Sequence, residues 1–217
     1  DEELIPDEQV VVTLTTENYI KRSPAVDYKR QGRGGKGRRG MTTRDEDLIE
    51  HLVVASTHDF LLFFTNKGRV FRLKGYEIPA TGLNAKGVAI VNLLQLQPEE
   101  KVSALIRVSK SEENGYLFMA TVRGVVKKTA YEQYRNVRTS GLIAINLDDG
   151  DELKWIRFST GDNEVVISTS LGQAIRFHEK EVRAMGRVSR GVRGIRLRPN
   201  DYVIGMDIVH EDSNIFV

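Results

Sequence analysis

The chain repeats one sequence pattern, and its clearest copy is Phe60-Leu61-Leu62-Phe63-Phe64-Thr65, an apolar run that precedes Gly68 by three residues. Consecutive apolar residues point to both faces of a strand, so this strand is expected to be buried between two layers. Glycine permits the positive φ that many tight turns require. The run therefore predicts a buried strand, a tight turn and a second strand.

Three further copies of this pattern lie along the chain. They are Tyr116–Thr121 with Gly124, Val165–Thr169 with Gly172, and a degenerate first copy, Val10–Thr15 with Asn18. Asn replaces Gly there because it is among the residues that tolerate positive φ. The Thr that ends each run, here called the repeat Thr, recurs after 50, 56 and 48 residues, at Thr15, Thr65, Thr121 and Thr169. A period of this length indicates an internal structural repeat.

Two more landmarks keep the same register in every copy. A glycine, here called the landmark Gly, follows the repeat Thr after 22, 22, 20 and 22 residues, at Gly37, Gly87, Gly141 and Gly191. A later β-type run follows at 52–54, 102–108, 153–158 and 202–209. Each copy thus reads as strand, Gly turn, strand, long loop, strand, acidic turn and strand, which is typical of propeller blades.

These landmarks predict an all-β, propeller-like fold of four-stranded blades in a single domain over residues 1–217. The four repeats are placed at about 8–57, 58–109, 110–160 and 161–211, and residues 212–217 start a further blade. No sustained 3.6-residue pattern follows a capping residue, so no long helix is expected.

The composition excludes several classes of function. Apolar residues at 40% and charged residues at 29% are typical of a soluble globular protein. The absence of cysteine excludes disulfides and thiolate chemistry, and no apolar stretch is long enough for a membrane-spanning helix. The four histidines are scattered without the spacing of metal ligands, so we expect no metal site and no catalytic residue.

Positive charge is concentrated in one segment of the first repeat. From Tyr19 to Arg44 there are nine Lys or Arg and one Asp, whereas the net charge of the whole chain is only +2. The segment contains Gln31-Gly32-Arg33-Gly34-Gly35-Lys36-Gly37-Arg38-Arg39-Gly40. Its glycines leave backbone N–H groups accessible, so we expect this loop to lie against the phosphates of a polyanion.

Basic residues also recur at fixed positions of the repeat. Seven residues after each repeat Thr the chain has Arg22, Arg72, Lys128 and Arg176, and three of the four landmark Gly follow Lys36, Lys86 and Arg190. We expect these side chains to line one edge of every blade, with the acidic turns on the opposite side. Such an arrangement favours duplex DNA held by its phosphates without sequence reading, because aromatic residues for base stacking do not interleave with the basic ones.

One family carries a closely similar signature. The box that marks the C-terminal domain of the A protein of DNA gyrase, a type IIA topoisomerase, resembles Gln31-Gly32-Arg33-Gly34-Gly35-Lys36-Gly37. The family usually has a basic residue at the second position, where this chain has Gly32. Tyr19–Arg22, Thr65–Val70 and Arg123–Lys128 are also similar to that family, and the similarity runs over essentially the whole chain.

The resemblance implies a β-pinwheel, usually of six blades, in which neighbouring blades exchange strands. It implies a bacterial cytoplasmic, nucleoid-associated protein that bends DNA around its basic rim with a handed sense. In that family the wrap supports ATP-dependent negative supercoiling by an A2B2 holoenzyme, which contains two gyrase A and two gyrase B proteins. The domain would be no enzyme on its own, because ATP and Mg²⁺ belong to other parts of the holoenzyme.

The resemblance also assigns DNA-binding roles by position. The box and the residues after it would hold DNA where the wrap closes, namely Gln31, Arg33, Gly34, Gly35, Lys36, Gly37, Arg38 and Arg39. The remaining contacts would come from Arg22, Arg72, Lys86, Lys128, Arg176 and Arg190. The family's DNA-cleaving tyrosine follows an arginine, and no tyrosine of this chain does, so the nucleophile is expected elsewhere.

Two alternatives remain open. The corresponding domain of topoisomerase IV has a similar pinwheel, although it lacks an intact box. A propeller-like scaffold for protein interactions would bind no DNA, and it would leave the aligned basic positions unexplained.

Overall fold

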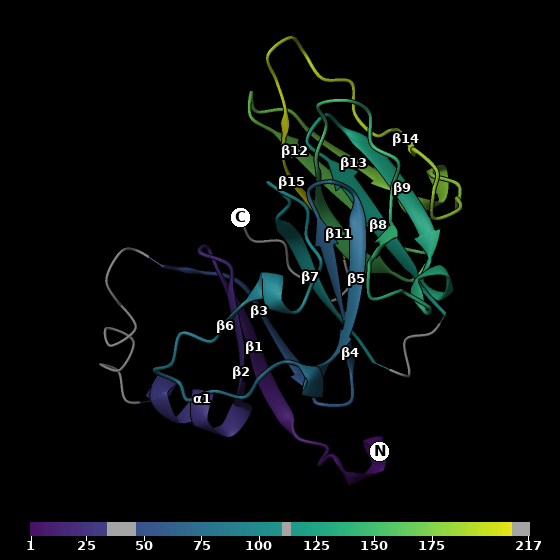
Figure 1. Cartoon of the computed structure of the whole chain (residues 1–217). Coiled ribbons are helices and arrows are strands. Elements are labelled where there is room, and N and C mark those ends of the chain that lie inside the picture. Colours follow the sequence, from purple (N-terminus) through teal and green to yellow (C-terminus); the bar gives the residue numbers. More distant parts are fainter. Residues whose placement is uncertain (34–46, 110–113, 210–217) are drawn as a thin grey trace.

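The computed structural model describes residues 1–33, 47–109 and 114–209, with the backbone alone from 30 to 33. The described chain is built almost wholly from antiparallel strands, which confirms the all-β prediction (Figure 1). Besides the strands there is one α-helix, α1 (Ala25–Arg33), and short 3-10 turns at Glu2–Leu4, Gly75–Glu77, Ile90–Asn92, Tyr131–Tyr134 and Glu179–Glu181.

The strands form four sheets, called here the first to fourth blades. The first is β3 (Ile49–Ser56), β1 (Gln9–Thr15), β2 (Tyr19–Pro24) and β6 (Val88–Ala89), in that order. The second is β10 (Leu142–Ile143), β5 (Arg69–Lys74), β4 (Phe60–Thr65) and β7 (Val102–Val108). The third is β11 (Leu153–Ser159), β8 (Tyr116–Thr121), β9 (Val125–Ala130) and β14 (Val192–Arg193). The fourth has β13 (Ala174–His178), β12 (Glu164–Thr169) and β15 (Val203–Val209).

Neighbouring blades exchange a short strand. The strand that follows each described landmark Gly pairs with the preceding blade: Val88 lies opposite Ile20, Leu142 opposite Val70, and Val192 opposite Val126. The fourth strand of each complete blade is therefore donated by the next repeat. This confirms the exchange that the family resemblance implied; the further blade expected from residue 212 lies outside the described residues.

The blades share a common orientation. Their last long strands lie against one another, β7 beside β3 and β11, and β11 beside β15, so these four are the inner strands (Figure 1). On the other side of each central strand lie β2, β5, β9 and β13, which we call the outer strands. Equivalent positions of the repeat therefore occupy equivalent places along the outer side of the molecule.

The core consists of apolar layers between successive blades. On β4, Leu61 and Phe63 pack toward the first blade, whereas Leu62 and Phe64 pack toward the third, and all four are fully buried. Burial of a side chain of this size contributes about 1.5–3 kcal/mol. The alternation confirms that the apolar run of the second repeat is a strand buried on both faces.

The hairpin turns explain the Thr and Gly of the pattern. The hydroxyl of each repeat Thr accepts a hydrogen bond from the backbone N–H four residues later, at 3.0–3.2 Å. The turn then needs a positive φ, which is +78° at Gly68, +89° at Gly124 and +85° at Gly172. Asn18 has a φ of +68°, so its predicted equivalence to these glycines is confirmed.

An acidic residue before each inner strand closes the same turn. Asp47, Asp151 and Asp201 each accept a hydrogen bond from the backbone N–H two residues after the repeat Thr. In the second blade, Glu100 instead binds the Thr65 hydroxyl at 2.7 Å and the Arg69 guanidinium at 2.8 Å. The acidic turns of the sequence therefore stabilise the hairpins.

The helix α1 differs from the predicted loop. It begins directly after Pro24, the last residue of β2, and it carries Asp27 in its first turn, where a carboxylate is favoured by the helix dipole. It packs on β1 and β2. The backbone of Gln31 and Arg33 therefore belongs to a helix, and the loop prediction is wrong for the start of the box.

The acidic N-terminal segment attaches to the second blade. Glu2 lies 3.0 Å from Lys74 Nζ and 3.3 Å from His58 Nδ1, and His58 Nε2 lies 2.7 Å from the carbonyl oxygen of Ile5. The hydrogen bond to Ile5 and the contact with Glu2 raise the pKa of His58. The segment is thus held by its own contacts to β5 and to the turn before β4.

Replacing the landmark Gly191 should destabilise the chain more than replacing the turn Gly172. A Cβ on Gly191, where φ is +86°, would lie 2.4 Å from the carbonyl oxygen of Val126, whereas a Cβ on Gly172, where φ is +85°, meets nothing within 4 Å. We expect Gly172→Ala to lose about 1–2 kcal/mol from the left-handed backbone alone, and Gly191→Ala to lose more. Thermal unfolding measures this as about 2–4 °C per kcal/mol.

The control is Gly186→Ala, because Gly186 has no positive φ and open space around it. It should leave the unfolding temperature nearly unchanged. A Gly191→Ala variant as stable as Gly172→Ala would contradict the close approach of the donated strand.

The turn carboxylate of the fourth blade should support stability only above acidic pH. Asp201 accepts hydrogen bonds from Ser170 Oγ at 2.7 Å and from the backbone N–H groups of Leu171 and Tyr202 at 3.0 and 2.9 Å. Burial alone would raise the pKa of Asp201, but hydrogen bonds lower it to about 2. A lowered folded-state pKa contributes stability above about pH 4 that is lost as the pH falls toward 2.

Urea unfolding across pH 2–7 tests this. Asp201→Asn should be less stable than the parent chain at neutral pH, and the difference should shrink between pH 4 and pH 2. The exposed Asp149→Asn is the control and should follow the parent at every pH. A constant difference between Asp201→Asn and the parent would contradict the role of the charge.

Candidate nucleic-acid interface

The four basic residues seven positions after the repeat Thr lie at one register of the outer strands. Their pairing partners on the central strands are Val12, Leu62, Phe118 and Val166, for Arg22, Arg72, Lys128 and Arg176 respectively. The repeat thus places them at equivalent points of every blade. Their surroundings nevertheless differ strongly.

Two of these side chains already have acidic neighbours. Arg176 is exposed and forms an ion pair with Glu164. Lys128 is buried, and its Nζ donates to the carbonyl oxygen of Glu179 at 3.0 Å and lies 3.7 Å from the Glu179 carboxylate. A phosphate could reach the Lys128 ammonium only if these contacts were exchanged.

The other two lack such partners. Arg22 is half-buried, and its Nε has no hydrogen-bond partner among the described residues. The Arg72 guanidinium lies over the Phe60 ring at 3.5 Å from its centroid and forms no ion pair or hydrogen bond within the described part of the chain. Burial lowers the pKa of Arg72, with Tyr131 and Glu77 opposing the shift. A half-buried cation without a carboxylate is a group that a bound anion would stabilise.

Arg72 opens into a cleft between the second blade and the third repeat. The third repeat contributes Arg135 and Arg138 to its wall, and the second blade contributes Lys74 and Glu77. The lining therefore includes four cationic residues and one carboxylate, and of these cations Lys74 is already paired with Glu2. This composition suits an anion such as a backbone phosphate.

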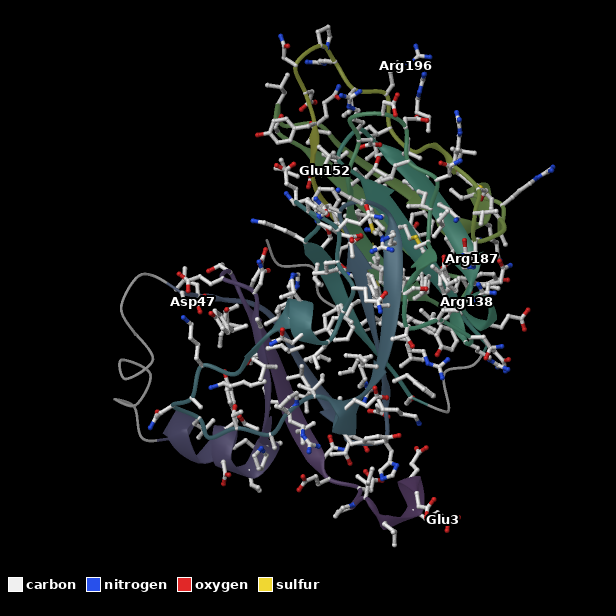
Figure 2. All side chains as sticks on the ribbon, in the orientation of Figure 1. Glu3, Asp47, Arg138, Glu152, Arg187 and Arg196 are labelled. Atoms are coloured by element: carbon white, nitrogen blue, oxygen red, sulfur yellow. The ribbon has the colours of Figure 1, made fainter. Side chains whose placement is uncertain are left out.

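The outer loops carry 11 of the 32 Lys and Arg residues. We call outer loops the segments between each outer strand and its landmark Gly, at 25–37, 75–87, 131–141 and 179–191. The side chain of Lys86 in the second loop is 58% exposed, and that of Arg190 in the fourth is 73% exposed. Figure 2 shows Arg138 and Arg187 on the side of the chain away from Asp47 and Glu152.

Arg135 and Arg138 were not predicted as site residues from the sequence. The third repeat has Ser140 before its landmark Gly, so the aligned position is not basic there. The basic content of the whole loop, rather than the single position before the landmark Gly, would have indicated them, because the loop has two arginines upstream of Ser140.

The expected separation of a basic side from an acidic side is incomplete. Arg190 lies 3.6 Å from Asp148, and Lys86 lies 3.6 Å from Glu17. Strand exchange is the cause, because it brings each outer loop beside the preceding repeat. For example, the N–H of Asn146 in the third repeat donates to the carbonyl oxygen of Ser189 in the fourth outer loop. Basic and acidic residues therefore meet where repeats overlap.

Comparison with known families identifies the fold and the repeat together. A family model described as the DNA gyrase C-terminal domain, beta-propeller, matches residues 9–56, 59–109, 115–159 and 163–210. The DNA gyrase A protein of Halalkalibacterium halodurans is 50% identical over 195 residues, which are 90% of this chain and 23% of that protein.

This chain belongs to the DNA gyrase C-terminal domain family.

Solved structures place the chain among the same domains. The C-terminal domain of DNA topoisomerase IV superposes with a TM-score of 0.79 at 30% identity, covering 95% of this chain and 63% of that one. The DNA gyrase A C-terminal domain superposes with a TM-score of 0.70 at 25% identity, covering 92% and 64%. The backbone alone resembles both the topoisomerase IV domain and the gyrase A domain, whereas the family model and the sequence relatives are those of gyrase.

The chain spans about a quarter of the length of the gyrase A relatives that it matches. Of the family's box, the structure describes only the backbone of Gln31, Gly32 and Arg33, at the end of α1. Gly34, Gly35, Lys36, Gly37, Arg38 and Arg39 lie outside the described residues. The box belongs to the first outer loop, which corresponds to the loops that carry Lys86 and Arg190.

Within 1–33, 47–109 and 114–209, no three His, Asp or Glu side chains converge as metal ligands would. In the same described ranges, no helix has the length and apolar character of a membrane span.

Proposed function

We propose that this chain binds duplex DNA without reading its sequence, and that it bends and wraps the duplex with a handed sense around the outer strands. The observation that carries the proposal is Arg72, a half-buried guanidinium that forms no ion pair among the described residues, in a cleft with Arg135 and Arg138. Phosphates would supply the missing negative charge. Arg22 would make the equivalent contact on the first blade, whereas Lys128 and Arg176 would have to exchange their contacts with Glu179 and Glu164 for phosphates.

Several features favour a duplex over a single strand. Single-strand binding relies on exposed aromatic rings on which bases stack. Among the large apolar side chains of the described residues, Tyr202 is the one exposed aromatic, and it precedes an inner strand. The basic groups are instead spread over successive outer strands and loops, which suits phosphates of a bent duplex.

Within a whole gyrase, the chain would act as one accessory wrapping domain of the gyrase A protein. It would contribute no catalytic residue, and ATP and Mg²⁺ would be bound elsewhere in a cytoplasmic, nucleoid-associated A2B2 assembly with the gyrase B protein. The handed wrap would present a second DNA segment to the cleavage site and so direct ATP-dependent negative supercoiling. Support comes from the gyrase A relatives, which match this chain over 90–98% of its length.

The role of a topoisomerase IV domain is the second candidate, favoured by the superposition with a TM-score of 0.79. The box from Gln31 to Gly37 argues against it, because that domain lacks an intact box. A protein-interaction scaffold is the third reading and predicts no salt-dependent DNA binding.

The direct test combines binding with topology. The full chain would be titrated with linear duplexes of increasing length across a salt series, and nicked circles would be ligated in its presence. If about six phosphates are neutralised, log K should fall with log salt at a slope of roughly −5. A steep slope with a linking-number shift of one sign supports wrapping; a flat salt response would leave the scaffold reading.

Arg72→Ala should weaken DNA binding at a single contact. Loss of one phosphate contact should reduce the magnitude of the salt slope by about one and weaken binding similarly for all sequences. The measurement is the same salt titration on one duplex.

The matched control is Arg157→Ala, which removes the same charge from the inner strand β11, where Arg157 lies 3.4 Å from Asp207. Its slope should equal that of the parent chain. Equal losses for both variants would mean that net charge, rather than the Arg72 cleft, determines binding.

The box should be essential for supercoiling but not for DNA cleavage. In a reconstituted holoenzyme, Arg33→Ala with Lys36→Ala should abolish negative supercoiling, because the wrap would no longer close. Relaxation and DNA cleavage should persist, since they would depend on other domains. Unchanged supercoiling by the double variant would remove the box from the proposed site.

A further inference from the structure

Two buried lysines have no role in the site described so far. Lys21 and Lys127 each lie six residues after a repeat Thr, on β2 and β9, and they are 7% and 0% exposed. Neither ammonium has a carboxylate within ion-pair distance among the described residues. Burial lowers the pKa of both groups, to about 8 for Lys127, where Arg187 adds to the effect.

Each ammonium group binds at least one backbone carbonyl of the next repeat, and Lys127 also binds a carbonyl of its own repeat. Lys21 Nζ donates to the carbonyl oxygens of Leu83 at 2.7 Å and Ala85 at 2.8 Å. Lys127 Nζ donates to the carbonyl oxygen of Ala144 at 2.7 Å and to that of Arg187. Leu83, Ala85 and Arg187 belong to outer loops, so each lysine links the outer strand of one blade to the outer loop of the next repeat.

The core itself does not require lysine at this position. The second and fourth repeats have Phe71 and Ile175 there, and both pack in apolar clusters. An unpaired ammonium costs free energy on burial, whereas an apolar side chain gains it. The lysines are therefore suited to a task that an apolar residue cannot perform, which is to fix the direction of loop carbonyls.

The tethered loops carry exposed cations. Ala85 directly precedes Lys86, and Arg187 precedes Arg190 by three residues. The landmark glycines after these cations pack against the lysine stems: a Cβ on Gly87 would lie 3.1 Å from Lys21 Cβ, and one on Gly191 would lie 3.2 Å from Lys127 Cβ. Each lysine thus holds the loop close to the point where its cation projects.

We propose that Lys21 and Lys127 are positioning residues for DNA binding, which hold the second and fourth outer loops so that Lys86 and Arg190 contact phosphates. Neither lysine touches the DNA itself, because both are buried. The proposal rests on the proposed function, since it assumes that the two loops face a duplex. It adds that buried cations on one blade set the contacts made by the next repeat.

Double-variant cycles on the full chain test the tethers, with the salt slope on one linear duplex as the readout. Lys86→Ala should reduce the magnitude of the slope by about one, as the loss of one phosphate contact does. Lys21→Met should reduce it by a similar amount although its side chain is buried. In the double variant the reduction of the slope should stay near one, because both substitutions remove the same phosphate contact.

The crossed pairs are the matched controls. Lys21→Met with Arg190→Ala should reduce the slope by about two, since these variants act on different loops, and Lys127→Met with Lys86→Ala should do the same. For the matched pair Lys127→Met with Arg190→Ala, the reduction of the slope should again stay near one. If a lysine variant weakened binding by destabilising the whole chain, its effect on the slope would combine in the same way with Lys86→Ala and with Arg190→Ala.

Each outcome has a distinct meaning. Single lysine variants that fold and bind with the parent slope would overturn the proposal, and so would equal coupling in matched and crossed pairs. Thermal unfolding is measured for every variant, and loss of folding in both single lysine variants would also overturn it, because the lysines would then hold the fold itself. A parent chain without salt-dependent binding would overturn the proposed function as well.

Discussion

The structure depends on the short strand that each repeat donates to the blade before it. This pairing joins β6 to β2, β10 to β5 and β14 to β9, so the blades are linked by backbone hydrogen bonds as well as by apolar layers. It requires a close backbone approach: a Cβ on Gly87 or Gly191 would lie 2.4 Å from a carbonyl oxygen of the neighbouring repeat. At these two junctions the landmark Gly is therefore a condition for joining the blades.

The same exchange determines where charge is placed. A donated strand draws the outer loop of its repeat over the preceding blade, so the basic residues of one repeat lie beside side chains of another. That explains why Arg190 meets Asp148, and why the Arg72 cleft has walls from two repeats. Charged groups held at such junctions lose contact with water, and here Arg72, Lys21 and Lys127 are buried to different extents without a carboxylate partner among the described residues. Backbone carbonyls take up the charge of the two lysines, whereas Arg72 is left for an anion to bind.

The features that the sequence predicts well are local ones. The Thr hydroxyl, the Gly or Asn turn and the two-sided apolar run each act within a few residues, so their meaning can be read from spacing alone. Strand partners are different, because the periodic pattern gives the order of strands but not the blade to which β6 or β14 pairs. The four aligned cations show the same limit: Lys128 is buried because Glu179 stands beside it in the fourth repeat, whereas Arg72 has no such neighbour. The helical start of the box was missed because Pro24 and Asp27 are modest helix signals beside the glycines that follow.

The blade scaffold alone does not distinguish the two kinds of topoisomerase domain. This chain superposes on a topoisomerase IV domain and on a gyrase A domain with TM-scores of 0.79 and 0.70. The difference in function must then arise from segments that the shared scaffold holds rather than from the scaffold. The first outer loop is the segment where this chain is most unusual, because its four Lys or Arg stand among four Gly, whereas the fourth outer loop has four Lys or Arg but only two Gly. Under the proposed function, the other outer loops would supply dispersed contacts along the path of the DNA, and the first would decide whether the path closes into a wrap.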